Sequence, residues 1–231
     1  MDANFNQGPI QSQAQTALNG FMSGVYKKMF AALCLTGIVS YVCSTNERIL
    51  TLLSGGFSIL LMLATLGIVI YLSARINKIP TENAHLLFWI YSALIGMTMA
   101  PIFIIYRGES IANTFFTTAI FFGGMSLYGY VTKRDLTALG SFMFVGLISI
   151  VIAMIINIFI HSSALQMGLS ALTIVVFCGL TAYDVQKIRT IYETHANAEN
   201  VEKYAIIASL SLYLDFINMF IALLRFLGDR K

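Results

Sequence analysis

Two acidic residues lie inside apolar stretches of the chain, where a charge is expensive. Asp215 lies in Ser-Leu-Tyr-Leu-Asp-Phe-Ile-Asn, and Asp184 lies in Gly-Leu-Thr-Ala-Tyr-Asp-Val-Gln-Lys-Ile. Placing an ionised Asp at the centre of a membrane-spanning helix costs about 2.5 to 3.5 kcal/mol on insertion scales. These two carboxylates are therefore the first candidates for a functional site.

The spacing of the two aspartates allows them to meet. The polar stretch 195–200 separates the apolar segments that carry them and lies about midway between them. If both segments cross the membrane as antiparallel neighbours, the carboxyls lie at similar depth. A close pair would share a proton and titrate as a unit, and the fully ionised pair would offer hard oxygen ligands suited to Ca²⁺. The sequence thus predicts a pH sensor that also binds a cation.

A purely structural interpretation of the same residues stays open. Asp184 lies where its apolar segment ends, so it could be an interfacial residue near a helix terminus. Asp215 could be a buried anchor whose oxygens are satisfied by neighbouring hydroxyl groups. The structural interpretation is weaker for Asp215, because a purely structural role does not account for the free-energy cost of a carboxylate at the centre of a membrane span.

Four other polar side chains are predicted to form a pocket around the pair. Asn218 follows Asp215 by three residues and therefore shares its helix face. Tyr183 lies directly beside Asp184, and Tyr213 lies near Asp215. Asn157 adds an amide in the apolar segment 139–160.

Two further residues have both a functional and a structural interpretation. Arg75 follows the second apolar segment. It could be a counter-charge for the carboxylates, or a snorkelling residue that only marks topology. Pro101 removes a backbone hydrogen bond inside the third segment and predicts a kink, which would be a hinge or a packing feature. The glycine pairs 55–56 and 123–124 are predicted to allow close approach of helices.

The composition excludes an ordinary water-soluble globule. Of the 231 residues, 58% are hydrophobic and 11% are charged, against about 25% charged residues in a typical soluble domain. The formal net charge is +3, and no basic stripe interleaved with aromatic residues is present. A nucleic-acid partner is therefore not expected, and most of the chain is expected to lie in the lipid bilayer.

Seven apolar stretches approach the length of about 20 residues that a helix needs to cross the hydrocarbon layer. Backbone groups in lipid must bond within their own segment, which predicts helices. The sequence therefore predicts an all-α polytopic membrane bundle, with residues 1–26 as a polar, disordered cytoplasmic tail and residues 27–231 as a single seven-helix membrane domain. The predicted spans are 29–45, 52–73, 86–106, 111–130, 139–160, 164–183 and 204–227.

The distribution of Lys and Arg predicts a cytoplasmic amino terminus. With that orientation, nine basic residues lie inside and five outside, as the positive-inside rule requires. Three of the five outside residues are Arg225, Arg230 and Lys231, at the carboxyl end. Their charge favours a last segment that dips in and returns, whereas its length of 24 residues favours a full crossing, which we adopt.

Three motifs resemble the Bax inhibitor-1 family, in particular its bacterial inner-membrane branch. They are the two aspartate motifs, 179–188 and 210–218, and the stretch Met-Ser-Leu-Tyr-Gly-Tyr-Val-Thr-Lys-Arg-Asp-Leu at 125–136. The resemblance implies a multi-pass inner-membrane protein whose last helix is central and wrapped by six others, with a calcium leak controlled by pH. By the same resemblance, Asp184 and Asp215 correspond to the family's paired aspartates, and Arg75 to the arginine that latches them in a closed form.

Two hypotheses for function follow. The first is a pH-regulated calcium leak channel gated by protonation of the aspartate pair, with Ca²⁺ as the transported ion and no other cofactor. The alternative is a membrane protein that binds and modulates a membrane-bound protease or stress-response partner through its polar amino-terminal tail. No enzymatic activity is expected, because Asp215 lacks the Gly-x-Gly-Asp motif of intramembrane aspartyl proteases and no other catalytic motif replaces it.

Overall fold

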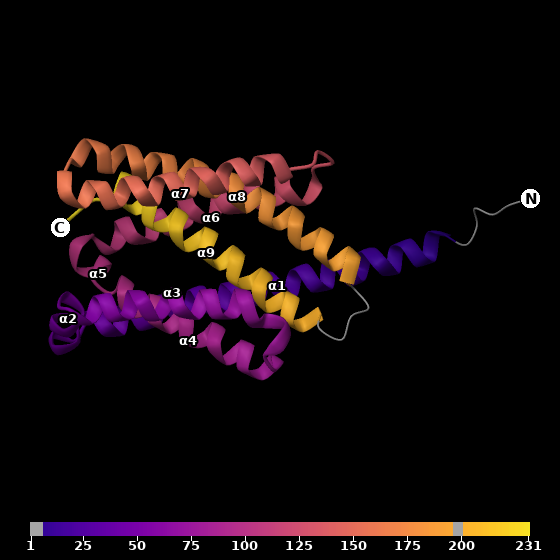
Figure 1. Ribbon diagram of the computed structural model, residues 1–231, viewed down its shortest axis with the longest axis horizontal. Coiled ribbons are helices and arrows are strands. Elements are labelled where there is room, and N and C mark those ends of the chain that lie inside the picture. Colours follow the sequence, from indigo (N-terminus) through magenta and orange to yellow (C-terminus); the bar gives the residue numbers. More distant parts are fainter. Residues whose placement is uncertain (1–6, 196–200) are drawn as a thin grey trace, which may run out of the picture.

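The protein is described by a computed structural model that covers residues 7–195 and 201–231 (Figure 1). Within these ranges the regular structure is helical, apart from one isolated antiparallel bridge between Tyr106 and Arg230. The helices are α1 (Gln7–Ser44), α2 (Glu47–Ser54), α3 (Phe57–Arg75), the 3-10 turn η1 (Ile76–Lys78), α4 (Thr81–Met99), α5 (Ile102–Ile105), α6 (Gly108–Val131), α7 (Thr137–Ile160), α8 (Ser163–His195) and α9 (Val201–Leu227). The predicted all-α class is confirmed.

Six spans in the described ranges are long and apolar enough to cross a membrane: α1, α3, α4 together with α5, α7, α8 and α9. Helix α6 has 24 residues but is less apolar, because Thr114, Thr118 and Ser126 interrupt it. These three side chains are buried, so they face protein and are not exposed to lipid. The count of seven crossings stays a prediction.

Helix α9 is the centre of the bundle, as the family resemblance implied. It runs diagonally between one group of helices formed by α1, α3 and α4 and another formed by α6, α7 and α8 (Figure 1). Within its most apolar window 72% of the residues are buried, against 6% for α7. Helices α1, α4, α6 and α8 pack directly on α9, whereas α3 packs mainly on α4 and α7 mainly on α8. An α9 side chain is therefore shielded from lipid on most sides.

The carboxyl terminus lies at the end of the bundle opposite to the start of α1 (Figure 1). Helix α9 is unbroken, and the residues after it hydrogen bond to the α5–α6 connection: the Arg107 N–H donates to the Asp229 carbonyl at 3.1 Å and the Lys231 N–H to the Ile105 carbonyl at 2.9 Å. The Lys231 ammonium also donates to the Phe103 carbonyl at 2.8 Å. These hydrogen bonds thus hold Arg230 and Lys231 at the end of the bundle opposite to the start of α1. The positive-inside rule alone disfavours basic residues at that end.

The amino-terminal boundary differs from the predicted one. Helix α1 already begins at Gln7, and Leu18, Met22 and Val25 are buried in the main core. The apolar residues are spaced three and four apart among Gln, Asn and Gly, so they form a buried stripe that a search for continuous apolar runs overlooks. Residues 1–6 lie outside the described ranges, and the division into a tail and one membrane domain otherwise stays a prediction.

The predicted second span is divided in two. Helix α2 ends at Ser54 and α3 begins at Phe57, so Gly55 and Gly56 form a turn between helices instead of a helix contact. A Cβ at Gly56, Gly123 or Gly124 would meet nothing within 4 Å. The predicted role of these pairs in close helix packing is wrong.

Close approach occurs at other glycines. A Cβ at Gly96 would lie 2.7 Å from the Thr36 carbonyl oxygen on α1. A Cβ at Gly129 on α6 would overlap the carbonyl oxygen of Ala182 on α8. These two positions set the α1–α4 and α6–α8 distances.

Candidate functional site

Asp184 and Asp215 lie on adjacent helices, as predicted. Helices α8 and α9 form the most extensive contact between helices in the described structure. Asp184 lies 11 residues before the end of α8 at His195, and Asp215 lies 14 residues after the start of α9 at Val201. The two carboxyls are close enough for their charges to repel each other. The apex predicted at 195–200 lies almost wholly outside the described residues.

Asp215 is an unusual buried acid. Only 4% of its surface is exposed, and its Oδ2 atom is buried without a hydrogen-bond partner among the described residues. An unsatisfied buried polar atom costs about 1 to 3 kcal/mol, and more when it is charged. The interpretation of Asp215 as an anchor satisfied by hydroxyl groups is therefore not supported for this oxygen. Such a carboxyl is suited to bind a proton or a cation.

Asp184 faces a small cavity of about 70 Å³ between α8 and α9. Ser211, one turn before Asp215 on α9, lines the same cavity. At about 30 Å³ for each water molecule, the space is sufficient for about two waters. The cavity therefore has room for water molecules next to Asp184.

A cation is held next to Asp184. The Lys187 ammonium follows Asp184 by three residues, lies close enough to attract its carboxylate, and is 5.7 Å from the centre of the Tyr183 ring. The Tyr183 ring packs against Gly140 on α7, where a Cβ would overlap it. Lys187 and Ser211 are not among the predicted site residues, although their helical spacing of three and four residues from the aspartates identifies both.

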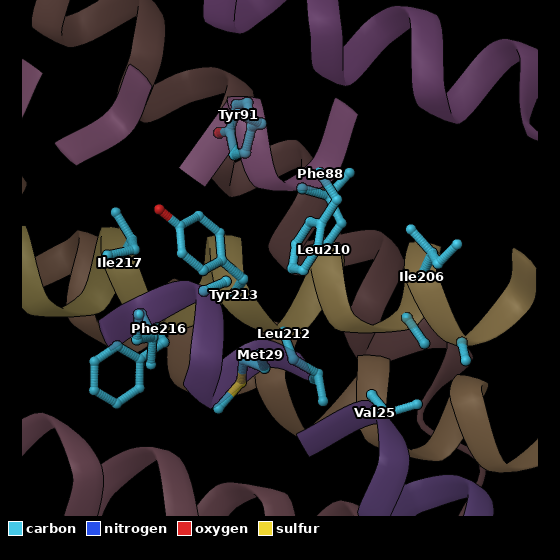
Figure 2. Packing of buried hydrophobic residues seen from close by; sticks show 14 of the residues in the cluster. Val25, Met29, Phe88, Tyr91, Ile206, Leu210, Leu212, Tyr213, Phe216 and Ile217 are labelled. Atoms are coloured by element: carbon cyan, nitrogen blue, oxygen red, sulfur yellow. The ribbon is translucent and has the colours of Figure 1, made fainter. Parts of the chain in front are cut away.

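Tyr213 does not belong to the pocket in which it was predicted. Its ring is fully buried and points toward Tyr91 and Phe88 of α4 (Figure 2). The Thr36 hydroxyl donates to the Ser92 carbonyl at 2.9 Å, so the Tyr213 hydroxyl donates to Thr36 at 2.7 Å. Residues two apart on a helix face different directions, and this separates Tyr213 from Asp215.

Tyr213→Phe is expected to lower the free energy of unfolding by about 1 kcal/mol, because one buried hydrogen bond is lost. The pH dependence of ion flux should not change, because the Tyr213 hydroxyl lies in the α1–α4 contact. Thermal unfolding in detergent and flux assays at several pH values measure the two effects, with Tyr71→Phe on the exposed face of α3 as control. An altered pH response in Tyr213→Phe alone would return the hydroxyl to the aspartate pocket.

The two predicted asparagines are also engaged elsewhere. The Asn218 side chain donates to the Leu214 carbonyl of its own helix at 2.8 Å. The Asn157 carbonyl oxygen accepts from the Ser162 N–H at 3.1 Å, at the α7–α8 turn. Asn157 lies beside Arg225 in a separate cavity at that end of the bundle. Of the four predicted supporting residues, Tyr213 and Asn157 bond to groups away from the aspartates, whereas Tyr183 precedes Asp184 directly and Asn218 lies one turn after Asp215.

Arg75 and Pro101 lie outside the two helices that carry the aspartates. Arg75 is exposed at the end of α3, and the described structure contains no ion pair between it and either aspartate. Its neighbour η1 packs on α9. Pro101 separates α4 from α5, so the predicted interruption of the third segment is present. Whether Arg75 is a latch and Pro101 a hinge stays a prediction.

The described residues contain no cluster of three or more His, Cys, Asp or Glu side chains that could bind a metal ion. A protein site for Ca²⁺ uses six to eight oxygen ligands, and the aspartate pair provides four. The pair alone therefore does not complete the coordination shell of a calcium ion.

The sequences of known proteins match this chain along most of its length. A sequence profile described as "Inhibitor of apoptosis-promoting Bax1" matches residues 18–231. An uncharacterized protein of Rickettsia prowazekii is 45% identical over 93% of this chain and 91% of its own length. Inner membrane protein YbhL of Escherichia coli is 43% identical over 95% of both chains. With a profile match from α1 to the carboxyl terminus and a helical membrane fold centred on α9, this chain belongs to the Bax inhibitor-1 family.

Proposed function

We propose that the chain is a pH-regulated calcium leak channel of the bacterial inner membrane, gated by protonation of the Asp184–Asp215 pair. The observation that carries this proposal is the buried Oδ2 atom of Asp215, which has no hydrogen-bond partner in the described part of the chain and lies near a second carboxyl. Two like charges in a medium of low dielectric constant are unstable unless a proton or a cation binds between them. Occupancy by either would change the force between α8 and α9.

The pathway proposed for the ion follows the α8–α9 contact. Ca²⁺ is the cargo here, and it would exchange part of its water shell for carboxylate oxygens as it passes. A cavity of about 70 Å³ has room for about two waters, so conduction needs separation of the two helices. We assign the arrangement described here to a narrow, non-conducting form.

Arg75 would act in the transition between forms. Because η1 packs on α9, a small shift of the α3–η1 junction would carry the guanidinium toward the pair. The carboxylates would then alternate between contact with this cation and contact with the transported ion, a local charge change acting on a two-state element.

Three observations support the inner-membrane location. The chain contains several apolar spans, its relative YbhL is named an inner membrane protein, and the basic residues are concentrated on the side of the amino terminus. We therefore place the amino terminus in the cytoplasm. No catalytic activity and no resident cofactor are part of the proposal.

Reconstitution of the full chain into vesicles that contain a calcium-sensitive dye tests the proposal. Calcium entry above that of protein-free vesicles is expected, with a rate that changes as the external pH is varied. An entry rate equal to that of empty vesicles at every pH would overturn the channel proposal. A rate independent of pH would overturn the gating step alone.

The second candidate function is binding to a membrane-bound protease or another stress-response partner. It is favoured by the amino-terminal part of α1, which projects beyond the other helices (Figure 1) and whose residues from Gln13 to Ala17 are exposed. Because Leu18 and Met22 are buried, a deletion that tests this surface must stop before them.

Deletion of residues 1–17 is expected to abolish capture of such a partner while calcium flux is retained, since the buried part of α1 from Leu18 onward is kept. Affinity purification from membranes followed by mass spectrometry measures the capture. A partner recovered equally with the full chain and the shortened chain would exclude this end of α1 as the binding surface.

A further inference from the structure

An apolar groove runs along the bundle between α1 and α6, with α9 as its floor. Two adjoining cavities of about 590 and 340 Å³ form this α1–α6 groove, and they share Leu33, Phe115 and Phe216. The larger cavity extends along α1 from Asn19 to Leu33, about 21 Å at 1.5 Å per residue. That length is about two thirds of the hydrocarbon thickness of a bilayer.

The groove opens to lipid. Its rim includes Phe30, Phe116 and Leu127, which are 59%, 66% and 63% exposed on helices that cross or line the membrane domain. Water would fill such a space only with two to four polar partners for each molecule, and the walls are mostly apolar side chains. Most of this space is therefore suited to hydrocarbon.

The size of the groove distinguishes an acyl chain from a protein helix. A helix of 24 residues is about 36 Å long and 10 Å across, and occupies roughly 2,800 Å³. The larger cavity provides about 590 Å³. An acyl chain is narrow enough to enter between α1 and α6, whereas a helix could only lie across the opening.

One end of the groove is polar. The Tyr130 hydroxyl on α6 donates to the Asn19 side-chain oxygen on α1 at 2.6 Å. Gln15 donates to both, at 3.0 Å to Tyr130 and 3.1 Å to Asn19, and the Arg189 guanidinium lies 5.8 Å from the Tyr130 ring centre. These bonds use the Tyr130 and Gln15 donors, and Arg189 also pairs with Glu193 at 2.9 Å and donates to the Tyr130 carbonyl at 3.1 Å. The Asn19 amide nitrogen and the remaining N–H groups of Arg189 can donate to the ester and phosphate oxygens of a lipid.

We propose that the α1–α6 groove is a binding site for a membrane phospholipid, with one acyl chain against Phe216 and the headgroup at the Gln15–Asn19–Tyr130 end. The acyl chain would contact α9 directly beside Asp215, the residue that precedes Phe216. This site is separate from the ion pathway between α8 and α9 and does not depend on the function proposed above.

Two adjacent glycines of α6 provide a matched test. A Cβ at Gly123 or at Gly124 would meet nothing within 4 Å, but only Gly123 lines the groove. Gly123→Leu should fill the groove without disturbing the fold, and Gly124→Leu adds the same side chain outside it. Equal thermal unfolding of both variants in detergent verifies that neither is misfolded.

Native mass spectrometry and phosphate analysis of the purified full chain measure the bound lipid. The wild type and Gly124→Leu are expected to retain phospholipid, and Gly123→Leu about tenfold less. Equal retention by all three, or retention by none, would overturn the proposal. A second copy or another protein bound in place of lipid would also overturn it.

Photo-crosslinking in vesicles distinguishes a lipid in the groove from lipids that merely surround the protein. A phospholipid with a photoreactive acyl chain should label Phe216 on the groove floor, which is 4% exposed, in the wild type and Gly124→Leu. The label at Phe216 should be lost in Gly123→Leu while the label at the exposed Phe30 remains. Labelling of Phe30 without Phe216 in the wild type would contradict the site.

Discussion

Replacement of Asp215 by Asn is expected to lower calcium flux about tenfold, equivalent to about 1.4 kcal/mol, and to flatten the pH dependence of the remaining flux. Asn has nearly the same size as Asp but cannot ionise, so the variant loses both the charge that attracts a cation and the shared proton. Because Asp215 is buried beside Asp184, no solvent-exposed group can replace its charge.

Asp184→Asn and the double variant extend this test. If the two carboxyls act as one titrating unit, each single substitution should remove most of the pH dependence, and the double variant should add little. Such non-additivity is expected of residues in direct contact. Additive effects would indicate two independent sites.

Asp135→Asn is the matched control for these variants. Asp135 lies in the loop before α7, outside the membrane spans, where hydrogen bonds from the Thr137 side chain and backbone hold its pKa below the ordinary value of 3.8. A carboxyl with a lowered pKa stays ionised at any pH above that value, so it cannot respond to pH in a flux assay at neutral or mildly acidic pH. An effect of Asp135→Asn as large as that of Asp215→Asn would mean that the response is not specific to the buried pair.

The fold was predictable from hydropathy, because lipid allows few alternatives. Long apolar stretches must be helices, and this located α7 and α9 to within a few residues. It also located α3 and α8, although α3 begins five residues after the predicted start at 52 and α8 continues twelve residues beyond the predicted end at 183. The same criterion failed where apolar residues are periodic and not continuous. The first half of α1 is such a case, since Leu18, Met22 and Val25 are buried among polar neighbours.

The aspartate pair was predictable because it depends on the order of segments along the chain. Two antiparallel neighbours that turn between Asp184 and Asp215 bring them to similar depth without further information. The supporting residues depend in addition on the rotation of each helix about its axis, which the linear sequence does not specify. This explains why Tyr213, only two residues from Asp215, bonds to Thr36 on another face of α9, and why Asn157 lies at the far end of the bundle.

The glycines show the same limit at the level of packing. The sequence contains 17 glycines, and doublets attracted the prediction of close approach. The structure instead uses single glycines at helix crossings, such as Gly129, where the α8 backbone is in contact. A crossing point depends on the relative placement of two helices, so spacing within one helix cannot locate it.

Gly129→Ala is expected to destabilise the protein by about 1 to 3 kcal/mol, the usual cost of overpacking. The added Cβ would meet Ala182 backbone atoms, with the Ala182 Cα only 2.9 Å away, and backbone atoms cannot move aside as a flexible side chain could. The sign is not trivial, because Ala is favoured over Gly within a helix by about 0.8 to 1 kcal/mol. Steric overlap must therefore outweigh a real gain in helix propensity.

Gly124→Ala, on the same helix, measures the gain in helix propensity alone, because a Cβ at Gly124 would meet nothing within 4 Å. The control should be neutral or more stable than the wild type, and Gly129→Ala less stable, in denaturant titrations in detergent. Because Ala182 precedes Asp184 by two residues, α8 can relieve the overlap only by moving the site, so Gly129→Ala should also alter calcium flux. Equal stability of the two variants would mean that α6 and α8 do not approach as closely at this crossing as the structure indicates.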